Sequence, residues 1–166
     1  MEIETRQAAL CVIWHGGSFL VAEIIDPRTG AVLHRPPGGG IEEGESPEQA
    51  VRRELKEELG VVLTHLRALE AIDHIWFWKG REVQERTWIF WADLSDDPRL
   101  SQGKAIEVTE ANGKRHKTLR RLLNDGRKAL PALCPSALPD LLRPILLDSA
   151  GSRLNAFRPN TPPVLK

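Results

Sequence analysis

The sequence predicts an α/β (α+β) fold in which a central mixed β-sheet lies between helices. Strand-like apolar runs lie on both sides of a strongly marked helix at residues 47–59, and a second helical segment comes late, at residues 136–147. A chain of 166 residues buries about two thirds of its unfolded surface and needs no metal or disulfide to build a core. We expect one domain over residues 1–147 and a polar, proline-bearing tail over residues 148–166.

The N-terminal part of the chain predicts three strands separated by turns. Residues 8–14 are continuously apolar and predict a buried strand, and a turn at residues 15–18 leads to a second strand at residues 19–25. Residues 26–30 read Asp-Pro-Arg-Thr-Gly, a strong turn signal because Pro presets φ and Gly accepts a left-handed conformation. A short strand follows at residues 31–35.

The next segment combines an irregular loop with the clearest helix in the chain. Residues 36–40, Pro-Pro-Gly-Gly-Gly, are expected to form no regular structure. Ser46 is a good N-cap for a helix over residues 47–59, and Gln49 completes a capping box with it. Gly60 stands where a left-handed C-terminal cap belongs.

The middle of the chain predicts a strand and then a hairpin. Residues 61–75 are expected to begin as a strand, with residues 67–73 ambiguous, and residues 76–78 and 83–94 predict a hairpin around a Lys79-Gly80 turn. Alternation along the second hairpin strand predicts one face made of Val83, Glu85, Thr87, Ile89 and Trp91.

The later elements are shorter and carry weaker signals. Residues 105–111 predict a strand, and residues 117–124 predict a helix that ends at an Asp-Gly pair. A final helix is expected over residues 136–147, interrupted near Pro139 or Pro144.

Composition excludes several classes of protein. Lys plus Arg and Asp plus Glu both number 23, so no global charge attracts the chain to nucleic acid or membrane. The longest apolar run is far shorter than the roughly 20 residues that cross a bilayer, and no signal peptide is visible at the N-terminus. Cys11 and Cys134 have no metal-ligand spacing and imply no disulfide framework. We therefore expect a cytoplasmic protein with no membrane partner.

One face of the predicted helix carries three carboxylates. At 100° per residue, Glu54, Glu57 and Glu58 fall within an arc of about 100° beside the apolar arc that faces the core. Like charges at these spacings destabilise a helix by about 0.2–0.5 kcal/mol per pair, and the neighbouring Arg53 cannot neutralise three anions. A divalent cation would, and oxygen ligands without Cys or His favour Mg²⁺, Mn²⁺ or Ca²⁺ over zinc. A solvated acidic surface is the alternative for these carboxylates taken alone.

The glycine loop stands directly before this acidic helix. Bare backbone at Gly39 and Gly40 would let a ligand approach closely. A metal, carboxylates and tight backbone together suit hydrolysis of a phosphoanhydride, because the metal neutralises phosphate oxygens and activates water while a carboxylate acts as base.

The order of these residues resembles the signature box of the Nudix hydrolases. Gly39, Glu45 and the run Arg-Glu-Leu-Lys-Glu-Glu-Leu-Gly-Val at residues 53–61 have the spacing of that box, and each of its defined positions is filled. The similarity covers residues 39–61 only. The preceding residues 35–42 resemble those of bacterial Nudix proteins of unassigned substrate.

The resemblance implies a Nudix-type α/β/α sandwich that hydrolyses nucleoside diphosphates linked to another moiety. It implies Mg²⁺ or Mn²⁺ and a ligand set made of Gly38 (through its carbonyl), Glu54, Glu57 and Glu58. Arg53 would pair with Glu45 and orient the acidic helix. The base that activates water varies within the family, so it stays open among the glutamates, with Glu54 as first choice.

The resemblance also leaves a late carboxylate ligand open. Family members often take one from a loop after the hairpin, and Glu107 and Glu110 are the candidates here, with Glu85 on the hairpin as a third. A plain surface position is the alternative for the first two, and the tryptophan that commonly follows this ligand is absent.

Substrate contacts are predicted on the glycine loop and the hairpin, at Arg35, Gly39, Gly40, Trp76, Trp78 and Glu85. Arg35 is a candidate for a phosphate contact, and the tryptophans are candidates for stacking a base, with core or rim packing as their alternative. The proline marker of ADP-ribose hydrolases and the tyrosine marker of dinucleoside polyphosphate hydrolases are absent.

We therefore predict a nucleotide pyrophosphohydrolase in which water attacks phosphorus. One alternative is a Nudix-like module that binds a nucleotide without turnover. Another is an RNA 5′-end pyrophosphohydrolase that uses the basic residues between 114 and 128, although a solvated helix face is the preferred interpretation of that segment and we do not expect a nucleic-acid partner. Family members frequently form homodimers, but no interface is evident in the sequence.

Overall fold

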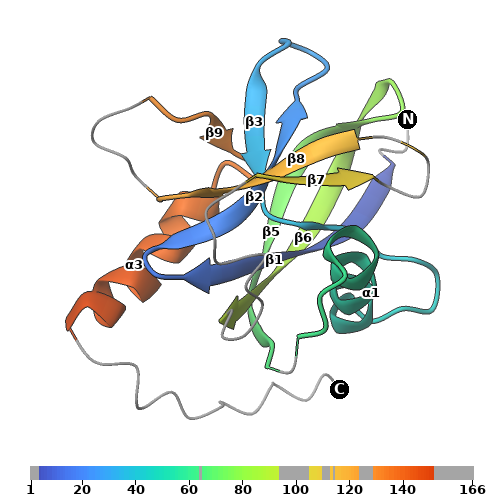
Figure 1. Cartoon of the computed structure of the whole chain (residues 1–166). Helices are drawn as coiled ribbons and strands as arrows, with labels where there is room; N and C mark the ends of the chain where they lie inside the picture. The colour runs from blue at the N-terminus through green and yellow to red at the C-terminus, as the bar shows by residue number, and fades with distance from the viewer. Residues whose placement is uncertain are drawn as a thin grey trace.

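The computed structural model describes residues 4–63, 65–93, 105–109, 113, 115–123 and 129–151. Two helices are described, α1 (Pro47–Leu59) and α3 (Leu138–Gly151). The described strands are β1 (Thr5–His15), β2 (Ser18–Ile25), β3 (Val32–Arg35), β4 (Gly38–Gly40), β5 (Arg67–Trp78), β6 (Arg81–Asp93), β7 (Ile106–Thr109), β8 (Arg115–Arg121) and β9 (Ala132–Leu133) (Figure 1).

The strands join into one mixed sheet, as predicted. The main order is β5-β6-β1-β2-β3-β9, with β4 paired to β1, β8 to β2 and β7 to β8. The pairs β1–β6 and β3–β9 are parallel, and the other pairs are antiparallel. The long parallel pairing of β1 with β6 brings the N-terminal strand beside the hairpin.

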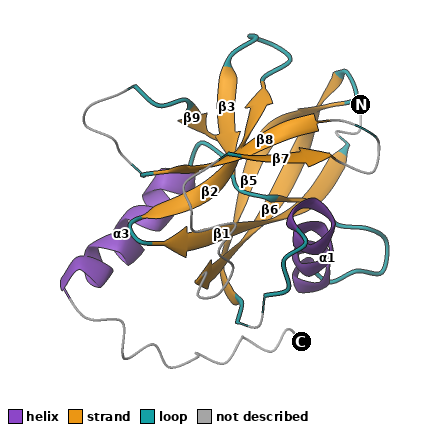
Figure 2. Ribbon diagram, viewed as in Figure 1, coloured by secondary structure: helices purple, strands orange, loops and turns teal. Residues whose placement is uncertain are grey.

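The two helices cover opposite faces of the sheet (Figure 2). Because side chains alternate along a strand, Ala9 and Cys11 of β1 pack in a cluster with Val51 and Leu55 of α1. On the other face, β1 contributes Leu10 and Val12 to a cluster that contains Leu138 and Leu142 of α3. The chain is therefore a sandwich with a helix on each side of the sheet.

The predicted hairpin and helix caps are present, but the strand expected from residue 61 begins only at Arg67 and runs through Trp78. Lys79 and Gly80 have φ of 47° and 82°, which suits the two-residue turn between Trp78 and Arg81. The five residues predicted to share a face of β6 are all buried. At α1, Ser46 and Gln49 form the capping box, and Gly60 has a left-handed conformation.

The glycine loop is a strand, which corrects the sequence prediction for residues 36–40. Gly38 to Gly40 form β4 and pair with residues 8–10 of β1. The pairing extends beyond the strand, since the amide of Cys11 donates to the carbonyl of Pro37 at 2.9 Å. Local composition predicted a loop because the partner strand is about thirty residues away in the chain, and long-range pairing overrides local propensity.

The prediction of a helix at residues 117–124 is also wrong. Arg115–Arg121 form β8, which lies between β2 and β7. Thr118 of β8 is opposite Ala22 of β2 and Ile106 of β7, so the strand gains hydrogen bonds on both sides. That pairing outweighs the helical propensity of its Lys, Leu and Arg residues.

The last helix begins later and ends later than predicted. α3 runs without a break through Pro144 to Gly151, where residues 136–147 were expected. Its apolar face is held by burial of Leu138 and Leu142, which stabilises the helix despite the hydrogen bond that Pro144 cannot donate. Residues 152–166 of the predicted tail lie outside the described residues. None of the described helices is long and apolar enough to cross a membrane.

Candidate active site

An arginine joins the acidic helix to the strand before it. Arg53 donates from Nε and Nη2 to the two carboxylate oxygens of Glu45, at 2.7 and 3.0 Å, and from Nη2 to the carbonyl of Gly40 at 3.1 Å. The Arg53 hydrogen bonds, helped by the backbone amide of Glu42, lower the pKa of Glu45 to about 2. The Arg53–Glu45 pair implied by the resemblance is therefore present and fixes α1 against the end of β4.

Glu54 is packed directly against the glycine strand. A Cβ at Gly39 would lie 2.4 Å from Glu54 Oε1, so only glycine leaves room for this carboxylate. Burial raises the pKa of Glu54, while the hydrogen bond from Arg53 Nη1, 3.0 Å long, acts in the opposite direction. The raised pKa means that the negative charge of Glu54 is incompletely compensated by its neighbours.

The other two glutamates lie on the same side of α1. The amide of Gly38 donates to Glu58 Oε2 at 3.3 Å, and Arg53 Nη1 approaches Glu57 Oε2 at 3.4 Å. Gly38 has φ of 135°, and a Cβ there would lie 2.1 Å from the carbonyl oxygen of Ala9. The structure thus brings Gly38, Gly39 and the three glutamates together at the junction of β4 and α1.

These residues fit a hard divalent cation by their chemistry. The ligands on offer are carboxylate oxygens and a backbone carbonyl, which Mg²⁺ and Mn²⁺ prefer, and the uncompensated charge of Glu54 would be stabilised by a cation. In the part of the chain that the structure describes, no group of three His, Cys, Asp or Glu side chains is placed so that it could hold a metal ion by itself. A Mg²⁺ site completed by water and substrate phosphates is consistent with that arrangement.

A second charged cluster lies on the opposite face of the sheet and centres on Glu85. The residue is 1% exposed. Its Oε2 accepts from Arg6 Nη1 at 2.6 Å, and its Oε1 accepts from Arg35 Nη2 at 2.8 Å and from Thr87 Oγ1 at 3.0 Å. His74 Nε2 lies 3.4 Å from Oε1. We call these five residues the Glu85 cluster.

The environment of Glu85 keeps it charged. Burial raises its pKa, but the hydrogen bond from His74 and the charges of Arg35 and Arg6 outweigh that effect and lower the pKa to about 2. Both carboxylate oxygens are occupied by these neighbours, so the structure places Glu85 as an anchor for two arginines. Arg35 and Glu85, both predicted as substrate contacts, lie together in this cluster, whereas sequence reasoning missed Arg6 and His74.

The rings of the two predicted tryptophans lie against the guanidinium groups of these arginines. The guanidinium of Arg6 lies 3.8 Å from the ring centroid of Trp78, and that of Arg35 lies 5.1 Å from the centroid of Trp76. Such distances are those of cation–π contacts. Arg6 therefore covers one face of the Trp78 ring, and a nucleobase cannot stack on that face.

The structure does not bring Glu107, the late carboxylate candidate that it describes on β7, to the acidic helix. Glu107 is exposed on β7, and its neighbours Ile106 and Val108 pack in the core cluster beneath α1. Because side chains alternate, Glu107 faces away from that cluster. Glu110 lies outside the described residues.

Two arginines of the basic segment between residues 114 and 128 make hydrogen bonds within the protein. Arg121 is 7% exposed and donates to the carbonyls of Pro131 and Leu122 at 2.8 and 3.1 Å, with its Nη1 3.0 Å from His34 Nδ1. Arg120 donates to the carbonyl of His15 at 3.0 Å. These two arginines hold β8 to its neighbours, and the basic residues at 114, 127 and 128 lie outside the described part of the chain.

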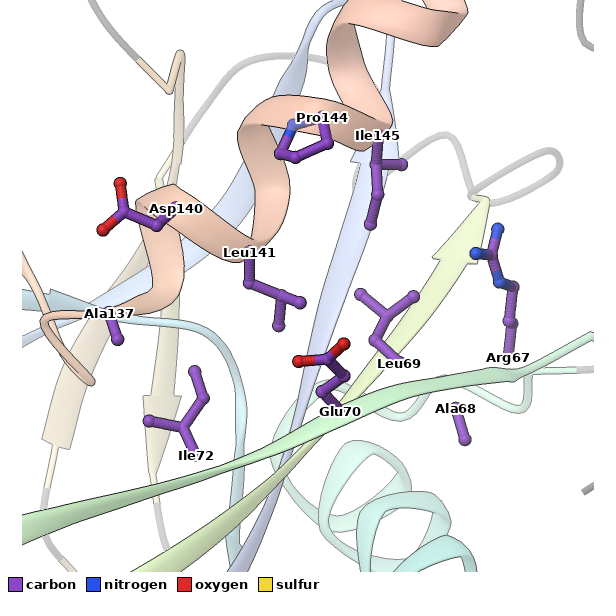
Figure 3. Close-up of a pocket in the computed structure, with 10 residues that line it drawn as sticks. All are labelled: Arg67, Ala68, Leu69, Glu70, Ile72, Ala137, Asp140, Leu141, Pro144 and Ile145. Atoms are coloured by element: carbon purple, nitrogen blue, oxygen red, sulfur yellow. The ribbon is translucent and has the colours of Figure 1, made fainter. Parts of the chain in front are cut away.

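A groove of about 580 Å³ lies between β5 and α3. Leu69 and Ile72 from β5 and Leu141 from α3 point into it (Figure 3). Both β5 residues pack with the cluster on the α3 face, which is also the face of Glu85. Ile72 pairs with Thr87 and His74 pairs with Glu85, so the groove adjoins the Glu85 cluster along β5. No sequence pattern predicts this groove, because β5 and α3, which line it, are distant in the chain.

Comparison with known proteins gives one family. The model of the NUDIX domain matches residues 4–124. An 8-oxo-dGTP diphosphatase of Escherichia coli (strain K12) is 37% identical over 78 residues, which cover 37% of this chain and 60% of that protein. An RNA pyrophosphohydrolase of Psychromonas ingrahamii is 53% identical over 38 residues, which cover 23% of this chain and 21% of that protein. The chain thus spans less than two thirds of either relative.

Solved structures share the fold. A MutT NUDIX hydrolase from Burkholderia pseudomallei superposes with a TM-score of 0.58 at 24% identity, over 82% of this chain and 95% of that one. A MutT protein from Methanosarcina mazei Go1 also has a TM-score of 0.58, at 18% identity, over 90% of this chain and 98% of that one.

Proposed function

Because this chain belongs to the Nudix family, we propose that it is a divalent-metal-dependent hydrolase of a phosphoanhydride bond in a nucleoside diphosphate linked to another moiety. The observation that carries the proposal is the junction of β4 and α1. There Arg53 and Glu45 fix the helix, and Glu54 lies against a glycine that leaves room for its carboxylate.

Glu54, Glu57 and Glu58 would hold the cation, together with the carbonyl of Gly38. When bound, Mg²⁺ or Mn²⁺ would neutralise phosphate oxygens and lower the pKa of water. The glutamates lie on one face of a helix whose N-terminus is capped and whose start is tied to β4, so their backbone positions are set before any ligand arrives. Such preorganisation favours catalysis, because little reordering is needed in the transition state.

Glu54 is the best candidate for the general base. Water would attack phosphorus and lose its proton to the Glu54 carboxylate, while the phosphoanhydride oxygen leaves with the second product. A base works best when its pKa lies nearer the working pH, and burial raises the pKa of Glu54. Its contact with Gly39 also fixes where the carboxylate lies.

An oxidised purine nucleoside triphosphate is the first substrate to test, since the E. coli relative is an 8-oxo-dGTP diphosphatase. RNA with a 5′-triphosphate is the second, because of the shorter match to an RNA pyrophosphohydrolase. The internal contacts of Arg120 and Arg121 leave less of the basic segment for RNA. A binding module without turnover is disfavoured by the complete acidic face, which such a module has no need to keep.

A hydrolysis screen with Mg²⁺ and with Mn²⁺ tests the proposal. The panel contains nucleoside triphosphates, 8-oxo-dGTP, nucleotide sugars, ADP-ribose, dinucleoside polyphosphates and 5′-triphosphate RNA. Glu57→Gln is the inactivating variant. Glu48→Gln is the matched control on the same helix, because Glu48 is exposed and pairs with Arg52 at 2.9 Å. We expect turnover of one substrate group, lost on chelation and in Glu57→Gln and kept in Glu48→Gln. Turnover by Glu57→Gln within about threefold of wild type would contradict the metal assignment, since loss of a ligand costs far more.

A further inference from the structure

The Glu85 cluster holds more positive charge than its own carboxylate balances. Arg6 and Arg35 each bond to Glu85 through one guanidinium nitrogen, at 2.6 and 2.8 Å. Two guanidinium charges thus share one carboxylate charge. The arginine side chains are 17% and 12% exposed, so water compensates this excess only in part.

The donors of these arginines are largely unused. Nε of Arg35 is buried and has no hydrogen-bond partner among the described residues. Arg6 bonds to Glu85 through Nη1 alone, while its Nη2 points towards Gly40, where a Cβ would lie 3.2 Å away. Burial lowers the pKa of Arg6, because loss of water around a guanidinium disfavours its charged form. A buried donor without a partner costs free energy, and a ligand with several acceptor oxygens would recover it.

The cluster lies next to the acidic helix but on the other side of one strand. A Cβ at Gly39 would meet Glu54, and a Cβ at the next residue, Gly40, would meet Arg6. Successive residues of a strand point to opposite faces, so β4 is all that separates Arg6 from Glu54, and Glu54 also contributes to the charge environment of Arg6. On its other edge β4 is bonded to α1, because the amide of Gly38 donates to Glu58 and the carbonyl of Gly40 accepts from Arg53.

We propose that Arg6 and Arg35 form an anion site that binds a phosphate group of the substrate, with Glu85 as the residue that positions both guanidiniums. The role of this anion as part of the substrate rests on the proposed function. A phosphate matches the site because guanidinium forks bond to its oxygens in a bidentate manner. Trp78 and Trp76 hold the guanidinium planes through cation–π contacts, so the tryptophans contribute to phosphate binding through the arginines.

Metal-free binding of inorganic pyrophosphate tests the anion site separately from hydrolysis. Isothermal titration in EDTA compares wild type, Arg6→Gln, Arg6→Lys, Arg35→Gln and Glu57→Gln. The matched control is Arg86→Gln, because Arg86 follows Glu85 on β6 but is half-exposed on the opposite face, paired with Asp73 at 2.7 Å. Arg35→Gln is independent of Arg6→Gln, so the test survives if one variant does not fold.

The two arginine-to-glutamine variants should weaken pyrophosphate binding by about tenfold to a hundredfold, the range expected for loss of charged hydrogen bonds. Arg6→Lys should recover part of the affinity, because the charge remains but the fork is lost, and Arg86→Gln should bind as wild type does. Glu57→Gln should lose hydrolysis yet keep metal-free binding. Wild-type affinity in both Arg6→Gln and Arg35→Gln, or no binding by wild type, would overturn the anion site. Failure of hydrolysis alone would count against the proposed function and leave the anion site standing.

Discussion

Replacing Gly39 by alanine is the sharpest test of how β4 shapes the active site. The new Cβ would lie 2.4 Å from Oε1 and 2.5 Å from the carboxyl carbon of Glu54. Ordinary contact needs about 3.5 Å, so the carboxylate must move by roughly 1 Å. Gly39 does not need a left-handed φ, and the atoms that must move are the end of a flexible side chain. Gly39→Ala should therefore fold.

The cost should appear in catalysis. A displacement of about 1 Å at a catalytic group lowers activity by about a hundredfold, and we expect that loss in kcat/KM on whichever substrate the screen identifies. Thermal unfolding should show a change in Tm of no more than a few degrees.

Gly44→Ala is the control, from the turn between β4 and α1. Gly44 has φ of 81° and open space around its Cβ position, so alanine there should destabilise the fold by about 1–2 kcal/mol through backbone strain and leave turnover unchanged. If Gly39→Ala retained activity within about threefold of wild type while remaining folded, the placement of Glu54 against Gly39 would not matter for catalysis.

Three further variants test one contact of the active site and two contacts that stabilise the fold. Glu45→Gln should lower kcat about tenfold without unfolding the protein, because Arg53 loses the charge that fixes it to the loop; steady-state kinetics and a melting curve decide this. Arg121→Met should destabilise the fold by about 2–4 kcal/mol, since it leaves buried carbonyls without a donor, and denaturant unfolding measures the loss; a change below about 1 kcal/mol would refute it. Burial and the charge of Arg121 lower the pKa of His34 below its usual 6.5. Below pH 6.5 the unfolded chain therefore binds a proton at His34 more readily than the folded protein does, and the free energy of unfolding decreases as the pH decreases. His34→Asn keeps an acceptor for Arg121 and should lose less stability than wild type between pH 7.5 and 5.5; equal losses would exclude His34 as the cause.

The acidic helix and the hairpin were predictable because their signals are local. Ser46 and Gln49 are three residues apart and specify the start of α1, and Lys79 with Gly80 specifies a two-residue turn. The pairing of Arg53 with Glu45 was implied by the resemblance to the Nudix box, and its two members are only eight residues apart. Each of these features depends on residues within about one or two helical turns of one another.

The Glu85 cluster was only half predictable because it depends on the register of distant strands. Arg6 lies opposite Glu85 only through the parallel pairing of β1 with β6, and nothing near Arg6 in the sequence indicates that partner. One usable signal existed: Arg6 has the same parity as Leu10 and Val12, so a buried face of β1 would carry the arginine along with them. β8 was missed for the same reason, because its stabilising partners are β2 and β7.

The consecutive glycines of β4 explain how two charged systems approach each other across one strand. A side chain at Gly39 would displace Glu54, and one at Gly40 would crowd Arg6. A strand without side chains is thinner than an ordinary one, so the carboxylate on one face and the guanidinium on the other are separated by little more than backbone. Glycine in a strand usually weakens it, but here pairing with β1 holds it. The glycines that predicted a loop therefore have another effect in the folded protein. Because they carry no side chains, the acidic helix and the proposed anion site can both lie close enough to bind one ligand.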